Sequence, residues 1–116
     1  MATYQILGIN DDESYCTLCG KVALKRVVWM ENTETNEINC YGTCCAAKLV
    51  LGKKTKSNSD RVFKFAQTMD AVKKWKENGF DVDKIARGIW NVFGFLTDKK
   101  NGNLFVDFNG EMIQVA

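Results

Sequence analysis

The sequence contains no histidine and no proline. Without histidine, the chain cannot form a Ser-His-Asp or Cys-His catalytic arrangement, a histidine metal site or an imidazole pH switch. It has no apolar run of the ~20 residues that a membrane-spanning helix needs, and its N-terminus, Met1 to Gln5, has no secretory signal pattern. We therefore expect a cytoplasmic protein without a membrane segment, in which thiols stay reduced.

The composition is that of an ordinary globular protein. The chain has 116 residues, of which 46% are apolar and 26% are charged. This length is typical of one domain, so residues 1–116 are predicted to form a single compact domain. The unusual count is five cysteines. In a reducing compartment, clustered cysteines indicate metal ligands or reactive thiols before they indicate disulfides.

The net charge of +2 is small, but it is unevenly distributed along the chain. Residues 1–47 carry 3 Lys/Arg and 6 Asp/Glu, whereas residues 48–116 carry 13 and 8. The basic residues gather in the segment Lys48, Lys53, Lys54, Lys56, Arg61 and Lys64, which contains Asp60 as its one acid. This segment is either a solvated loop kept basic for solubility or an electrostatic patch for phosphate or an acidic protein surface.

The first half of the chain is predicted to hold three strands and one short helix. Residues 4–9 form a short apolar run, and residues 23–30 alternate between two faces with β-branched and aromatic side chains. A polar loop over 31–36 leads to a return strand over 37–41. Residues 44–51 are then predicted to form a helix that ends at Gly52.

The second half is predicted to hold two helices followed by a β-meander. One helix runs from Ser59 or Asp60 to about Asn78, and a second is capped by Asp81 and ends near Gly94. Asn-Gly pairs at 101–102 and 109–110 favour tight hairpins between strands that include residues 104–108 and 111–115. The fold class is therefore α+β with antiparallel strands. We expect Trp75 and Trp90 to be buried on the helical stripes, and Val28 and Ile38 to join the hairpin to the core.

Four of the cysteines have the spacing of a zinc site. Cys16 and Cys19 form a C-x2-C knuckle, a hairpin returns the chain to Cys40, and Cys45 falls in the first turn of the predicted helix. Four thiolates suit tetrahedral Zn²⁺ in a closed structural site. Such a site has no open position for a metal-activated water, so we expect one structural zinc and no enzymatic activity. The adjacent Cys44 could replace Cys45 as the fourth ligand.

The order of knuckle, hairpin and helix N-terminus resembles a treble-clef zinc finger. The runs Cys16-Thr-Leu-Cys19-Gly20-Lys21 and Tyr41-Gly42-Thr43-Cys44-Cys45-Ala46-Ala47-Lys48 are similar to a pattern in small accessory proteins of phages and mobile elements. The resemblance covers residues 15–51 and implies a finger over 15–52, with Cys40 and Cys45 as the second ligand pair. The helical pair and the C-terminal hairpins would then occupy 59–116.

Two other interpretations of the cysteines remain open. Buried free thiols can act as small hydrophobic side chains. A disulfide or a redox pair is the other alternative, although the C-x2-C knuckle lacks the strand-to-helix context of a redox motif.

Two binding functions follow. The resemblance implies an accessory protein that docks on a host protein complex in the host cytosol and inhibits or modulates it, as anti-CRISPR proteins do. The alternative is a nucleic-acid-binding zinc finger that uses the basic segment. The candidate surface for either partner is Lys25, Arg26, Trp29, Lys48, Lys53, Lys54, Lys56, Arg61 and Lys64. The sequence gives no indication of oligomeric state.

Overall fold

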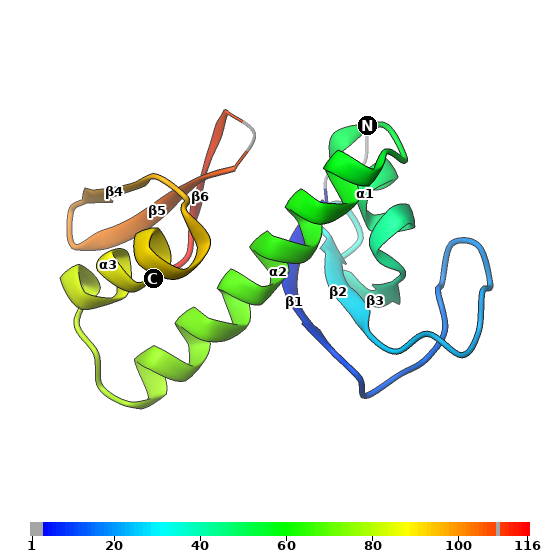
Figure 1. Ribbon diagram of the computed structural model, residues 1–116, viewed down its shortest axis with the longest axis horizontal. Helices are drawn as coiled ribbons and strands as arrows, with labels where there is room; N and C mark the ends of the chain where they lie inside the picture. The colour runs from blue at the N-terminus through cyan, green and yellow to red at the C-terminus, as the bar shows by residue number, and fades with distance from the viewer. Residues whose placement is uncertain (1–3, 109) are drawn as a thin grey trace. The chain divides into compact units, whose positions relative to one another are not determined.

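The computed structural model describes residues 4–108 and 110–116, which form an α+β fold of three helices and six strands (Figure 1). The chain groups into two compact units, Met1–Gln67 and Thr68–Ala116. The boundary falls inside the long helix α2 (Lys56–Glu77). Within the described ranges, no helix has the length and apolar character that crossing a bilayer requires.

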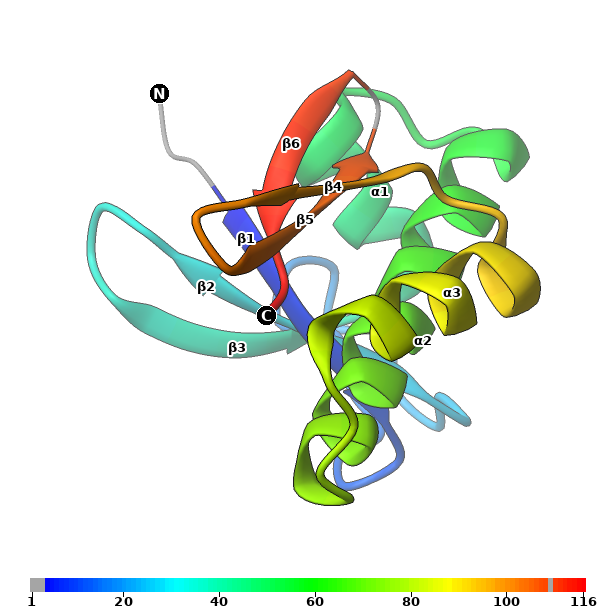
Figure 2. The ribbon, with the colours of Figure 1, turned by 90° about the vertical axis from the view of Figure 1, so that its left-hand side faces the viewer.

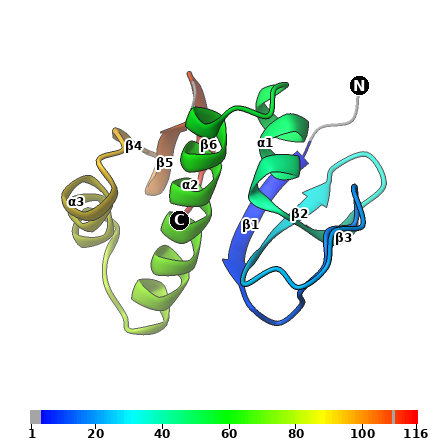
Figure 3. The same ribbon diagram turned by 45° about the vertical axis from the view of Figure 1, so that its right-hand side comes forward.

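The N-terminal unit is built on a three-stranded antiparallel sheet in the order β1-β2-β3. Its strands are β1 (Tyr4–Asn10), β2 (Val27–Asn32) and β3 (Glu37–Tyr41). Helix α1 (Thr43–Leu51) follows β3 after one residue, Gly42, and contacts β1 and β2, as Figure 3 shows. This order of strands, hairpin and helix confirms the predicted α+β class.

The strand predicted over 23–30 is shorter at its start and longer at its end. Ala23 has a φ of 59°, which is incompatible with a strand, and the Leu24 N–H donates to the carbonyl of Ser14 at 2.9 Å. The chain therefore forms a loop until Val27. At the other end β2 continues to Asn32, whose Oδ1 accepts from the Glu34 N–H at 2.9 Å and starts the turn.

Local capping residues explain where α1 ends and where α2 begins. Gly52 ends α1 with a φ of 85°, as predicted. Helix α2 begins at Lys56, one turn before the predicted Ser59. The reason is Thr55, whose Oγ1 accepts from the Asn58 N–H at 3.1 Å and so serves as the helix cap.

The C-terminal unit contains helix α3 (Val82–Phe93) and a three-stranded antiparallel meander, shown in Figure 2. Asp81 caps α3, as predicted, by accepting from the Lys84 N–H at 2.8 Å. The strands are β4 (Thr97–Lys100), β5 (Asn103–Phe108) and β6 (Glu111–Gln114). Asn101 and Gly102 both have positive φ, as a tight Asn-Gly hairpin requires. In the second predicted turn, Asn109 lies outside the described residues.

Each unit buries its own apolar side chains. The largest fully buried ones in the N-terminal unit are Phe65, Met30, Val27, Val28 and Val62. In the C-terminal unit they are Ile85, Ile89, Leu104, Val72 and Val106. The predicted burial of Val28 is therefore confirmed. The single-domain organisation of residues 1–116 stays a prediction.

Two core predictions were wrong, because Trp90 and Ile38 are each 55% exposed. Ile85 and Ile89 lie at the centre of the buried face of α3, and Trp90 is rotated by about 100° from Ile89 around the helix. Ile38 pairs with Glu31 near the turn of the hairpin, whereas α1 begins next to the opposite end of β3. Periodicity predicted that both residues face a core but did not show how far each face is covered.

The close approach of α2 and α3 within the C-terminal unit makes a testable prediction at Gly88. A Cβ atom at this position would lie 2.8 Å from Cη2 of Trp75. Overpacking of this kind costs about 1–3 kcal/mol, against a gain in helix propensity of about 1 kcal/mol. We expect Gly88→Ala to lower the free energy of unfolding by about 1 kcal/mol in a denaturant titration.

The matched control is Arg87→Ala, at the exposed neighbouring position of the same helix. It should change the free energy of unfolding by less than about 0.5 kcal/mol. A Gly88→Ala protein that is more stable than the parent would contradict the packing of Trp75 on Gly88.

Candidate metal centre

The C-x2-C segment folds into a tight knuckle between β1 and β2. The Gly20 N–H donates to the Cys16 carbonyl at 2.9 Å, and the Cys16 N–H donates to the Lys21 carbonyl at 2.9 Å. Gly20 has a φ of 74°, a conformation that glycine adopts without strain. These bonds hold the side chains of Cys16 and Cys19 on one side of the loop.

Backbone contacts also attach the knuckle to β3. The Thr17 N–H donates to the carbonyl of Cys40 at 2.9 Å. From Cys40 the chain passes through Tyr41 and Gly42 directly into α1. The knuckle, the end of β3 and the first turn of α1 are therefore neighbours, as the finger pattern predicted.

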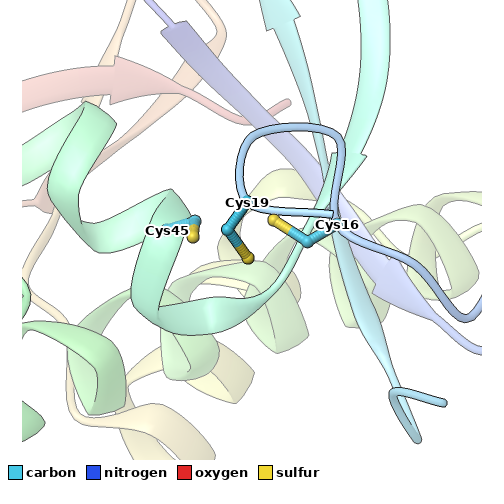
Figure 4. Close-up of side chains that lie close together, drawn as sticks. All are labelled: Cys16, Cys19 and Cys45. Atoms are coloured by element: carbon cyan, nitrogen blue, oxygen red, sulfur yellow. The ribbon is translucent and has the colours of Figure 1, made fainter. Parts of the chain in front are cut away.

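Three of the five cysteines form a compact cluster at this junction. The Sγ atoms of Cys16, Cys19 and Cys45 all lie within 4.8 Å of one another. Figure 4 shows Cys16 and Cys19 reaching in from the knuckle and Cys45 from the start of α1. Cys16 and Cys45 are buried, and Cys19 is exposed. All five cysteines are free thiols in the structure, so the three sulfur atoms are close but not bonded.

The surroundings of Cys16 favour a thiolate. Burial of the side chain raises the pKa of Cys16, but hydrogen bonds from the backbone N–H groups of Cys19, Gly42 and Leu18 outweigh it. Together with a hydrogen bond from the Cys19 side chain, they lower the pKa of Cys16 to about 7. A sulfur with several N–H donors is the kind of ligand that a thiophilic cation requires.

Cys45 shows the electrostatic cost of bringing three thiols together. Burial raises the pKa of Cys45 first, and its hydrogen bonds to Cys19 and Cys16 and their negative charge raise it further, to about 11. The three groups can all be thiolates only when a cation compensates their charge. The donor set thus fits Zn²⁺, which binds thiolate sulfur and releases protons from it.

Cys40 is buried beside the knuckle but does not belong to the cluster. Its thiol donates to the carbonyl oxygen of Tyr15 at 3.4 Å. A side-chain hydrogen bond with Cys40 also raises the pKa of the Tyr15 phenol. The predicted role of Cys40 as a zinc ligand stays a prediction.

The adjacent cysteines at the start of α1 have different positions. Cys45 is buried in the cluster, whereas Cys44 is exposed and accepts a hydrogen bond from the Ser59 hydroxyl at 3.5 Å. Successive side chains on a helix are about 100° apart, so the two thiols point in different directions although both residues line one pocket. The residue that the cluster includes is Cys45.

A pocket of about 250 Å³ opens at the cluster. Its lining consists of Cys16, Cys19, Lys21, Leu24, Gly42, Thr43, Cys44, Cys45 and Lys54. Two ammonium groups and no carboxylate therefore border the space next to the three thiols.

The basic residues of the predicted surface are all exposed. They are Lys25, Arg26, Lys48, Lys53, Lys54, Lys56, Arg61 and Lys64. Arg26 lies over the ring of Phe63, 5.9 Å from its centroid, which places the loop after the knuckle beside α2 within the N-terminal unit. Trp29 is half-buried, and its indole N–H donates to Asn10 Oδ1 at 2.6 Å. Part of its ring is therefore unavailable for stacking.

Sequence reasoning assigned no role to the residues next to the knuckle cysteines. Lys21 borders the pocket, and Tyr15, Leu18 and Val22 are exposed on the knuckle. The available signal was the presence of large apolar residues inside a loop that fits neither a helical nor a strand period.

No family model, curated protein or solved structure matches the chain. What the molecule itself establishes is an α+β fold with a three-cysteine cluster that could bind a metal such as zinc.

Proposed function

We propose that this chain is a non-enzymatic, zinc-stabilised binding protein that docks on a host protein complex and inhibits or modulates it. The observation that carries the proposal is the convergence of three thiols from the knuckle and α1 within 4.8 Å. The role of a phage or mobile-element accessory protein, of the anti-CRISPR or anti-defence kind, comes from the sequence resemblance over residues 15–51.

In this proposal one zinc ion is bound by Cys16, Cys19, Cys45 and Cys40, in a treble-clef-like finger. Cys40 would supply the fourth thiolate, because the Thr17 N–H of the knuckle donates to the Cys40 carbonyl at 2.9 Å. Its thiol would exchange the hydrogen bond to the Tyr15 carbonyl for a bond to the metal. A neutral hydrogen bond contributes only about 1 kcal/mol, whereas a structural zinc site stabilises the fold by about 10 kcal/mol or more.

A zinc ion with four thiolate ligands has a structural role. It has no open position for a water or a substrate, so the site supplies folding free energy instead of catalysis. The N-terminal unit needs this contribution, since the knuckle and the loop that follows it up to Val27 contain no regular strand or helix.

A second candidate function, nucleic-acid binding, is favoured by one observation. The basic segment from Lys48 to Lys64 is exposed at each of its six Lys and Arg residues. Phosphate contacts of this kind need no defined pocket and depend strongly on salt. The small net charge of +2 favours the protein-docking function over a strong non-specific nucleic-acid binder.

The zinc proposal predicts that the N-terminal unit depends on metal. Purified protein should contain about one zinc per chain, because four thiolates form one tetrahedral site. Removing zinc with a chelator should unfold the N-terminal unit, since the binding free energy is folding free energy. Elemental analysis and circular dichroism check this. Zinc-free protein that stays fully folded would rule out a structural site.

The ligand set makes a separate prediction that a pair of cysteine variants can test. In protein loaded with Co²⁺, Cys40→Ser should weaken the sulfur-to-cobalt charge-transfer absorption and lower the metal affinity. Cys44→Ser is the matched control and should leave both unchanged, because its thiol lies outside the cluster. Cys16→Ser should abolish the site and unfold the N-terminal unit. If Cys44→Ser weakened the absorption and the metal affinity while Cys40→Ser left both unchanged, the proposed ligand set would be contradicted.

The nucleic-acid alternative predicts salt-dependent binding to DNA or RNA. In a mobility-shift titration, the affinity should fall steeply between two salt concentrations, with a log–log slope of about 0.9 for each phosphate contact to duplex DNA. The triple variant Lys53→Glu, Lys54→Glu, Lys56→Glu should lose binding. The matched triple variant Lys73→Glu, Lys74→Glu, Lys76→Glu, with the same change in net charge, should retain it. An absence of binding at low salt would exclude this function.

A further inference from the structure

We propose that the chain docks on its protein partner through the face formed by Tyr15, Leu18, Lys21, Val22 and Lys54, hereafter the knuckle face. The partner surface that fits it is an apolar patch bordered by Asp or Glu side chains. This inference rests on the proposed docking function and adds the location of the interface and the chemistry of the partner.

The first observation is the exposure of three apolar side chains within eight residues. Tyr15 is 45% exposed, Leu18 is 49% exposed and Val22 is 69% exposed. A loop gains nothing for its own stability by presenting such side chains to water. Exposed apolar residues that gather in one place are characteristic of interaction sites, whereas isolated ones are not.

The second observation is that the backbone of the knuckle is already fixed. Hydrogen bonds of 2.9 Å join Gly20 to Cys16, Cys16 to Lys21 and Thr17 to Cys40. The Leu24 N–H closes the loop on the carbonyl of Ser14 at 2.9 Å. A loop that is held in this way loses little conformational entropy when a partner binds, so its apolar area contributes more fully to affinity.

The third observation is the charge beside the apolar residues. Lys21 and Lys54 border the pocket at the cysteine cluster, and no acidic residue is among its lining residues. In the part of the chain that the structure describes, neither ammonium group has a carboxylate within ion-pair distance. Glu13 lies near enough to Tyr15 to add to the rise in the Tyr15 pKa that a hydrogen bond with Cys40 mainly causes. The two lysines border the pocket beside the start of α1.

These features favour a protein over a nucleic acid as the occupant. Phosphates would use Lys21 and Lys54 but would gain nothing from the aliphatic side chains of Leu18 and Val22. A protein surface uses both, since interfaces combine an apolar centre with a charged rim that sets orientation. The complementary rim for two lysines is acidic.

The N-terminal unit also supplies a matched control position. Ile38 is 55% exposed and Val22 is 69% exposed, so both side chains reach solvent. Ile38, however, lies on β3 next to Glu37 and opposite Glu31. It therefore has similar exposure with an acidic environment, away from the knuckle face.

The experiment places the photo-crosslinking residue p-benzoylphenylalanine at position 22 or at position 38 of the full chain. Each protein is expressed in cells of the organism that the chain acts in and is irradiated there. We expect one protein to be crosslinked from position 22 and not from position 38. Lys21→Glu together with Lys54→Glu should reduce that adduct by about tenfold, since two like charges would then meet the acidic rim. Mass spectrometry should place the crosslink next to Asp or Glu.

Each other result overturns the proposal. An adduct that forms equally from position 38, or a partner that co-purifies without any crosslink from position 22, would move the interface elsewhere and leave the docking function intact. An adduct that nuclease treatment removes would identify the occupant as nucleic acid. If no partner co-purifies with any form of the protein, the docking function itself fails. Zinc content and thermal unfolding of each variant establish that the folded protein is being compared.

Discussion

In the N-terminal unit, three thiols lie so close together that they can all ionise only if a cation compensates their charge. Cys16, Cys19 and Cys45 place their sulfur atoms within 4.8 Å of one another, and two of the three side chains are buried. The N–H groups that converge on Cys16 lower its pKa to about 7, while Cys45 is raised to about 11 by burial and by the other two sulfurs. A divalent cation removes this conflict, because it stabilises all three thiolates together. The knuckle and the start of α1 are the elements that such an ion would join.

The sequence predicted the features of the fold that local chemistry determines. The C-x2-C-G spacing required a tight knuckle, the cap at Asp81 required a helix, and the Asn-Gly pair at 101–102 required a hairpin. It did not predict which way the Cys40 thiol points, because that depends on the carbonyl of Tyr15, a contact between residues 25 positions apart. It also placed Trp90 in a core, because periodicity assigns a face without showing what covers it.

Metal binding and partner docking would use the same short segment of chain. The loop that presents two thiols of the cluster also carries the apolar residues of the knuckle face, so one ion would fix both. The use of one loop for both roles suits a small protein, in which an apolar core alone gives limited stability. It also explains how a loop without regular structure can offer a rigid surface. Among the described residues, the three clustered cysteines all belong to the N-terminal unit, and the C-terminal unit has its own buried side chains around α3 and the meander.

We expect thiolate sulfur to hold a zinc ion at the junction of the knuckle, β3 and α1. X-ray absorption spectroscopy at the zinc edge of the purified protein tests it directly, because the first coordination shell reports the ligand atoms themselves. We predict a shell of four sulfur atoms at about 2.3 Å. A first shell made of oxygen or nitrogen atoms would contradict it.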